Sequence, residues 1–236
     1  MKFHLVRPAL VLASSLALAS CGGGGKETFP VKVTVFNVQY PGLILTTNGQ
    51  ELPIPVPAKA GDNVVTSFPN GLDYGTAYNV VPKGGTAVDG LGSQPAHQSC
   101  YTAGYPNGNY PREYGTAGQT ASIESARTPA IEVFYQCEVN TYALTGSVTG
   151  LNTDGVTLTL INGSNSQVVV TGISTATAPL PFALAKVQYN TSFGVTVLTQ
   201  PAGYTCTVAN GVGVMDDALE KLGGNLNVAV TCVKNS

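Results

Sequence analysis

The sequence predicts an all-β protein built from two tandem units. Three observations predict this: a composition poor in charge, an alternation of apolar and polar residues, and a weak internal repeat. Charged residues make up 10% of the 236 residues, and glycine occurs 28 times. An average globular protein has about 25% charged residues. Long helices draw on Glu, Lys, Leu and Ala, whereas strands and tight turns draw on β-branched residues, Gly and Asn, so the composition favours strands.

The first segment, residues 1–20, has the features of an export signal. Lys2 and Arg7 precede a mostly apolar run over residues 9–19, and small residues follow. This order of positive charge, apolar run and small residues is typical of a secretory signal peptide. The apolar run is shorter than the about 20 residues that a membrane-spanning helix needs. We therefore expect residues 1–20 to be cleaved off.

The signal ends in the tetrad Leu18, Ala19, Ser20 and Cys21. This tetrad resembles the lipobox of bacterial lipoproteins, in which the cysteine thiol receives a diacylglycerol and the chain is cut just before it. The resemblance implies a cell-envelope protein with palmitate-type acyl chains on Cys21. Gly22, in place of Asp, implies an outer-membrane anchor, with the periplasmic or the surface-exposed face left open. The alternative is a conventional signal peptide in which Cys21 is incidental.

A tether over residues 21–30 follows the signal. It contains four consecutive glycines and no apolar periodicity. Glycine-rich chain is flexible, so the first folded unit is expected to hang close to the membrane.

An internal repeat divides the rest of the chain. Residues 33–48 and residues 144–162 both read as a strand, a turn with glycine, a second strand and then Asn-Gly. Each copy continues into a strand with an aromatic residue, then a cysteine, and then a closing strand that ends in another cysteine. The repeat predicts two β domains, over residues 31–140 and residues 141–236.

Four cysteines remain besides Cys21: Cys100, Cys137, Cys206 and Cys232. An even set in an exported chain predicts disulfides, and four cysteines allow three connectivities. Their matching positions in the two copies favour Cys100 with Cys137 and Cys206 with Cys232. In both closing strands the cysteine shares a face with the apolar residues, so the disulfides are expected to be buried.

The second unit contains the segments TVLTQPAGYTCTVANGVG and NVAVTC. Together they resemble repeats in uncharacterised proteobacterial lipoproteins that have immunoglobulin-like β-sandwich domains. The resemblance covers residues 144–234 and, more weakly, residues 31–138. It implies two tandem immunoglobulin-like β-sandwich domains, each with one disulfide, after a cleaved lipoprotein signal. It brings no catalytic residue.

One segment departs from the β pattern. Residues 215–222 read MDDALEKL, with apolar residues at spacings of 3, 4 and 7, acids at the start and two glycines after the end. This pattern predicts a short helix between the last two strands.

Several function classes have no support in the sequence. The net charge is −2 and lysines and arginines do not cluster, so we expect no nucleic-acid partner. No CxxC pair occurs and the chain after the signal has one histidine, so we expect no metal and no cofactor. An alternative is a lipid-anchored hydrolase that uses His97, which lies near Ser99. Because no GxSxG elbow accompanies it, we interpret His97 as a loop histidine beside a disulfide.

A tyrosine-rich insertion, residues 101–119, separates Cys100 from the closing strand of the first unit. Tyrosine offers broad, stiff contact area at low entropic cost, and neighbouring Asn and Gly adapt their hydrogen bonds. The alternative is that these rings pack back onto the domain. The candidate ligand contacts are Tyr101, Tyr105, Tyr110, Arg112 and Tyr114.

The sequence thus predicts a non-enzymatic cell-envelope lipoprotein, a structural or binding and adhesion module whose ligand it does not reveal. The expected partners are the membrane, through the N-terminal lipid, and a glycan or an envelope protein. Besides the hydrolase, a second alternative to this module is an accessory subunit of an envelope complex.

Overall fold

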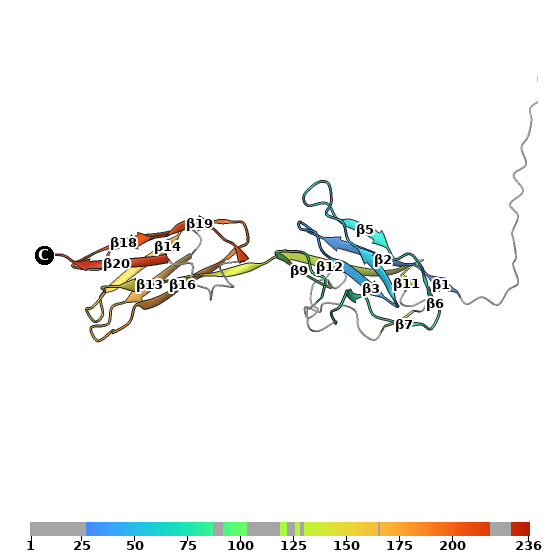
Figure 1. Cartoon of the computed structure of the whole chain (residues 1–236), viewed down its shortest axis with the longest axis horizontal. Helices are drawn as coiled ribbons and strands as arrows, with labels where there is room; N and C mark the ends of the chain where they lie inside the picture. The colour runs from blue at the N-terminus through green and yellow to red at the C-terminus, as the bar shows by residue number, and fades with distance from the viewer. Residues whose placement is uncertain are drawn as a thin grey trace, which may run out of the picture.

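The computed structural model describes residues 27–86, 92–102, 119–121, 126–127, 130–164, 166–217 and 228–236. The signal, Cys21 and most of the tether lie outside these residues. Two hydrophobic cores are present, one between Phe29 and Cys137 and the other between Tyr142 and Cys232. We call the strands around them the first and the second unit, and Figure 1 shows the two units end to end. Among the described residues, no helix has the length and apolar character to cross a membrane.

The first unit consists of two main sheets and two short strand pairs. The larger sheet contains β2 (Val31–Phe36), β5 (Val64–Ser67), β9 (Gln98–Thr102), β11 (Ala126–Arg127) and β12 (Ala130–Val139). β2 lies between β5 and β12, while β9 and β11 pair with successive parts of β12. The smaller sheet contains β4 (Gln50–Pro53), β3 (Ile44–Thr47) and β8 (Val81–Pro82), in that order. The short pairs are β1 (Thr28–Phe29) with β6 (Leu72–Asp73), and β7 (Ala77–Tyr78) with β10 (Gln119–Thr120).

The second unit consists of two four-stranded sheets that share one hydrophobic core. One sheet has the order β16 (Leu180–Gln188), β13 (Thr141–Thr149), β20 (Val228–Lys234) and β18 (Tyr204–Ala209). The other has the order β15 (Ser166–Thr171), β14 (Thr157–Asn162), β17 (Ser192–Thr199) and β19 (Val212–Val214).

The alternation seen in the sequence places the core. In β2, Val31, Val33 and Val35 are fully buried, and the residues between them are half-buried. In β20, Val228 and Val230 are buried while Ala229 between them faces solvent. Successive side chains of a strand point to opposite faces, so these alternating valines face the core. All-β architecture, the first expectation from the sequence, is confirmed for the described residues.

The two units share one strand order, as the repeat predicts. In each, the first strand pairs in parallel with the last: β2 with β12, and β13 with β20. Counting β13 to β18 as strands one to six and β20 as seven, strands one, four, six and seven form one sheet. Strands two, three and five form the other, together with the short strand β19. Immunoglobulin constant domains instead group strands one, two, four and five. The strand order is therefore not that of an immunoglobulin constant domain.

Both disulfides join directly opposite residues of neighbouring strands. Cys100 on β9 faces Cys137 on β12, and Cys206 on β18 faces Cys232 on β20, with a Cα–Cα distance of 4.0 Å in each pair. This is the pairing that the repeat favoured, and all four side chains are buried. In antibody domains the disulfide joins the two sheets. Here each disulfide stays within one sheet and ties the last strand to its neighbour.

The helix expected over residues 215–222 is described in its first part alone. Met215 is buried and its backbone bonds to the turn before β17, with N–H donating to the carbonyl of Thr191. Helical structure begins at Asp217, two residues later than the pattern suggested. Residues 218–222 lie outside the described residues.

Removing the second disulfide is expected to destabilise the second unit. Cys206 and Cys232 are 26 residues apart in the sequence, and their disulfide closes a loop in the unfolded chain. Replacing both with Ala removes this cross-link. The unfolded chain then gains conformational entropy, which lowers the free energy of unfolding by about 3.5 kcal/mol. Urea denaturation followed by circular dichroism measures it. The matched control is Thr207→Ala with Thr231→Ala, a directly opposed pair on the same two strands. An equal loss in the control and the disulfide variant would contradict the assignment.

Candidate functional site at the junction of the two units

One residue joins the two units. β12 ends at Val139 and β13 begins at Thr141, so Asn140 alone lies between them. The N–H of Asn140 donates to the carbonyl of His97 at 2.9 Å, and its carbonyl accepts from the N–H of Tyr189 at 2.9 Å. Its side-chain oxygen accepts from the hydroxyl of Ser99 at 2.9 Å. Because the linking residue is hydrogen-bonded to both units, its backbone is held in place between them.

Three aromatic rings pack across the junction. The rings of His97 and Tyr189 stack, with centroids 3.7 Å apart and planes at 3°. Tyr40 meets both rings edge to face, at 5.3 Å from His97 and 5.8 Å from Tyr189. Aromatic pairs in these geometries contribute about 0.5–1.5 kcal/mol each beyond the area they bury. Tyr40 and His97 belong to the first unit and Tyr189 to the second, so the rings hold the units together.

Carboxylates lie next to this cluster. Nδ1 of His97 is 3.0 Å from Oδ2 of Asp217, and the side chains are 24% and 30% exposed. The nitrogen meets the distance of an ion pair but not the angle of a hydrogen bond, so the attraction is one of charge when the imidazole is protonated. Partial burial, and then the nearby charges of Asp216 and Asp217, raise the pKa of the Tyr189 phenol. Tyr189 is therefore a neutral hydroxyl at ordinary pH.

A repeated motif shapes the turn that carries His97. Residues 94–100 read QPAHQSC and residues 200–206 read QPAGYTC. In both, the glutamine side chain pairs with the backbone of the cysteine: Gln94 accepts from the N–H of Cys100 at 2.8 Å and donates to its carbonyl at 3.1 Å, and the second copy repeats this at 2.8 and 3.0 Å. The fourth residue has positive φ, 62° at His97 and 74° at Gly203. The same backbone turn thus carries a ring in one copy and glycine in the other.

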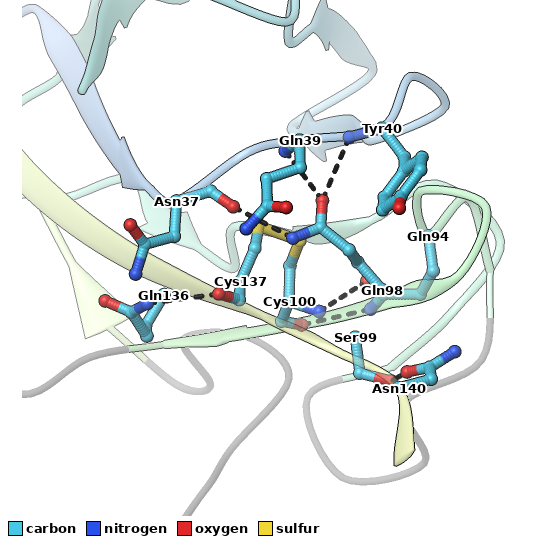
Figure 2. Close-up of a disulfide and its surroundings, with 10 residues drawn as sticks. All are labelled: Asn37, Gln39, Tyr40, Gln94, Gln98, Ser99, Cys100, Gln136, Cys137 and Asn140. Carbon is cyan, nitrogen blue, oxygen red and sulfur yellow. Dashed lines mark hydrogen bonds between the residues drawn. A yellow bond between two sulfur atoms is a disulfide. The ribbon is translucent and has the colours of Figure 1, made fainter. Parts of the chain in front are cut away.

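Gln98 fixes the loop of residues 37–40 in the first unit. This residue is 2% exposed, and both polar atoms of its side chain are hydrogen-bonded. Oε1 accepts from the N–H groups of Gln39 and Tyr40 at 2.8 and 3.1 Å, and Nε2 donates to the carbonyl of Asn37 at 2.9 Å (Figure 2). A buried amide satisfied in this way holds its partners in one arrangement. Gln98 therefore positions the backbone that carries Tyr40.

A groove of about 500 Å³ opens at the junction. It is lined by backbone or side-chain atoms of Asn37, Gln39, Tyr40, Cys137, Glu138, Val139, Thr141, Gln188, Tyr189, Asn190 and Thr191. Neutral amides, hydroxyls and two aromatic rings dominate this lining, and Glu138 is its one carboxylate. The groove takes residues from both units, so its shape depends on the junction.

The structure gives His97 and Ser99 structural contacts. His97 packs on Tyr189 and Tyr40, and Ser99 bonds to Asn140. These contacts account for the histidine singled out as a candidate for hydrolysis.

Tyr101 is the one candidate ligand contact in the described part of the insertion. Its hydroxyl donates to the carboxylate of Glu138 on β12, which ties the start of the insertion to the sheet. The remaining candidates lie outside the described residues, as does Cys21: they are Tyr105, Tyr110, Arg112 and Tyr114.

The junction residues were missed in the sequence. The sequence marks His97 as a lone histidine, and its patterns do not point to Gln98, Asn140, Tyr40 or Tyr189. Aligning QPAHQSC with QPAGYTC would have indicated that His97 stands where the other copy needs glycine. A histidine at positive φ strains the backbone, so it indicates that the ring makes a contact that offsets this cost.

Comparisons with known proteins give little further guidance. No protein-family model and no curated protein matches the chain. Among solved structures, the major pilin protein T-13 from Streptococcus pyogenes serotype GAS131465 is similar at 12% identity, over 89% of this chain and 97% of that chain, with a TM-score of 0.25. The major pilin protein T3.2 from Streptococcus pyogenes serotype GAS13637 is similar at 12% identity, over 89% and 98%, with a TM-score of 0.20. Similarity at this level carries no argument about function. What the described residues define is an all-β protein with two disulfides.

Replacing His97 with Gly is expected to loosen the junction without unfolding either unit. Glycine keeps the positive-φ turn, as Gly203 does in the second copy, while the stacked ring is lost. Nitroxide labels at the exposed positions Val65 and Val169, one in each unit, report the distance distribution by pulsed electron paramagnetic resonance. We expect a broader distribution with an unchanged melting temperature.

The matched control is Asn210→Gly, another positive-φ residue changed to glycine within the second unit. It should leave the distance distribution as in the parent protein. A distribution of unchanged width in His97→Gly would contradict the role of the ring.

Proposed function

We propose that this protein is a non-enzymatic, lipid-anchored module of the cell envelope that presents a binding surface close to a membrane. The observation that carries the proposal is the one-residue junction, bonded to both units and packed by three rings. A fixed arrangement of two β units suits a scaffold, because a surface that spans both units keeps its shape.

The proposed architecture is two tandem β-sandwich domains, over residues 31–140 and 141–236. Support comes from the cores, since the sheets of each unit contribute to one hydrophobic cluster. The domains are immunoglobulin-like in having two sheets around one core, with a strand order of their own.

The proposed anchor is acylated Cys21 in the outer membrane. The tetrad that ends in Cys21 and the glycine at position 22 support it. One acyl chain binds a membrane marginally, so two or three chains are needed for stable attachment. The tether spans at most about 35 Å at roughly 3.5 Å per residue, which keeps the first domain near the bilayer.

A structural role for His97 favours this proposal over a lipid-anchored hydrolase. Its ring is engaged with Tyr189 and Tyr40, and its backbone carbonyl is engaged with Asn140. These contacts give the histidine a purpose in joining the units.

The tyrosine-rich insertion is proposed as a binding surface for a glycan or an envelope protein. The Tyr101 hydroxyl bonded to Glu138 fixes the base of the insertion on β12. Its contacts would be Tyr105, Tyr110, Arg112 and Tyr114.

Replacing Cys21 with Ser is expected to release the protein from the membrane, because a serine hydroxyl does not accept the thioether-linked lipid. After expression in a Gram-negative host, membrane and soluble fractions are compared, and the N-terminal peptide is weighed by mass spectrometry. The parent should carry acyl chains on Cys21 and sediment with membranes. The matched control, Ser20→Ala, keeps a small residue before the cysteine and should stay attached. An unmodified N-terminal peptide in the parent protein would overturn the anchor.

A further inference from the structure

We propose that the groove at the junction binds a neutral oligosaccharide. This inference rests on the proposed function, since it names the ligand class of a surface module. It concerns a site separate from the tyrosine-rich insertion.

The chemistry of the lining fits a ligand rich in hydroxyl groups. Residues with side-chain amides line the groove from both units, among them Gln39 in the first and Gln188 in the second, and both are exposed. An amide offers an acceptor and two donors, so it matches a sugar hydroxyl, which both donates and accepts. Tyr40 and Tyr189 line the groove beside these amides. Amides beside aromatic rings are a combination suited to carbohydrate.

The size of the groove fits a short oligosaccharide segment. Its volume of about 500 Å³ lies within the range of about 300–1,000 Å³ found for small-molecule sites. The glutamines at positions 39 and 188 are exposed, so they can reach a ligand that lies along the surface.

The charge of the groove selects against acidic ligands. Glu138 is the one ionisable carboxylate in the lining, and no lysine or arginine of the described residues lines it. Asp216 and Asp217 act on Tyr189 through their charges, which adds to the negative potential there. Like charges disfavour uronic or sialic acids, so a neutral glycan is the better match.

The groove is organised before any ligand arrives. Gln98 holds the backbone of residues 37–40, and Asn140 holds the N–H of Tyr189. On the second unit, the N–H of Asn190 donates to the carbonyl of Met215 at 2.8 Å. A site held in this way loses little entropy on binding, which favours affinity.

The test uses the acylated mature protein in detergent micelles. An array of neutral hexose and N-acetylhexosamine oligomers is probed together with uronic-acid oligomers, and affinity for the best neutral oligomer is measured by calorimetry. We expect binding to neutral oligomers, and at least a tenfold loss in the double variant Gln39→Ala with Gln188→Ala. The melting temperature should be unchanged, because both side chains are exposed. Amide chemical shifts of the parent protein should change around residues 37–40 and 188–191.

The matched control is Gln167→Ala, an exposed glutamine of the second unit outside the groove, which should bind as the parent does. Binding to no neutral oligomer, preference for uronic-acid oligomers, or undiminished affinity in the double variant overturns the proposal. Loss of binding in Tyr105→Ala with Tyr110→Ala and Tyr114→Ala, and not in the double variant, overturns it in favour of the insertion. Acylation of Cys21 is checked by mass spectrometry on the same preparations, so failure of the groove is distinguished from failure of the anchor.

Discussion

The structure depends on a constraint at Asn140, where the last strand of one unit becomes the first strand of the next with no spare residue. The N–H, the carbonyl and the side-chain oxygen of this residue are all hydrogen-bonded, and the partners come from both units. Because β12 and β13 are each paired along most of their length, a rotation at Asn140 would break these bonds. The rings of Tyr40, His97 and Tyr189 pack together at the junction. The groove opens between residues of the first and the second unit.

The motif QPAHQSC of the first unit recurs as QPAGYTC in the second, and both copies form the same local structure. Each copy closes with the glutamine amide on the cysteine backbone and with an asparagine, Asn140 or Asn235, that accepts from Ser99 or Thr205. The N–H of each asparagine donates to the positive-φ residue, His97 or Gly203. Left-handed backbone is less costly for glycine than for other residues. Histidine at this position is explained by its stacking on Tyr189, a contact that the second copy does not make.

The sequence predicted what depends on local pattern. Alternation identified the buried valines of β2 and β20, and the repeat identified the disulfide partners. It did not predict the strand order, because alternation says which face a residue takes and not which strand lies beside it. It did not predict the junction either, since Tyr40 and Tyr189 are far apart in sequence and meet through long-range pairing. Both backbone groups of Met215 are bonded to the turn at residues 190–191, and helical structure begins at Asp217.

The central claim is that the two units form one rigid body through the junction. Residual dipolar couplings of backbone amides, measured on the mature chain with Cys21→Ser in a dilute aligning medium, test this most directly. Couplings from β2 and β12 report on the first unit, and couplings from β13 and β20 report on the second. The account predicts that one alignment tensor fits all four strands in the orientation of the structure. Two tensors of different magnitude would contradict it.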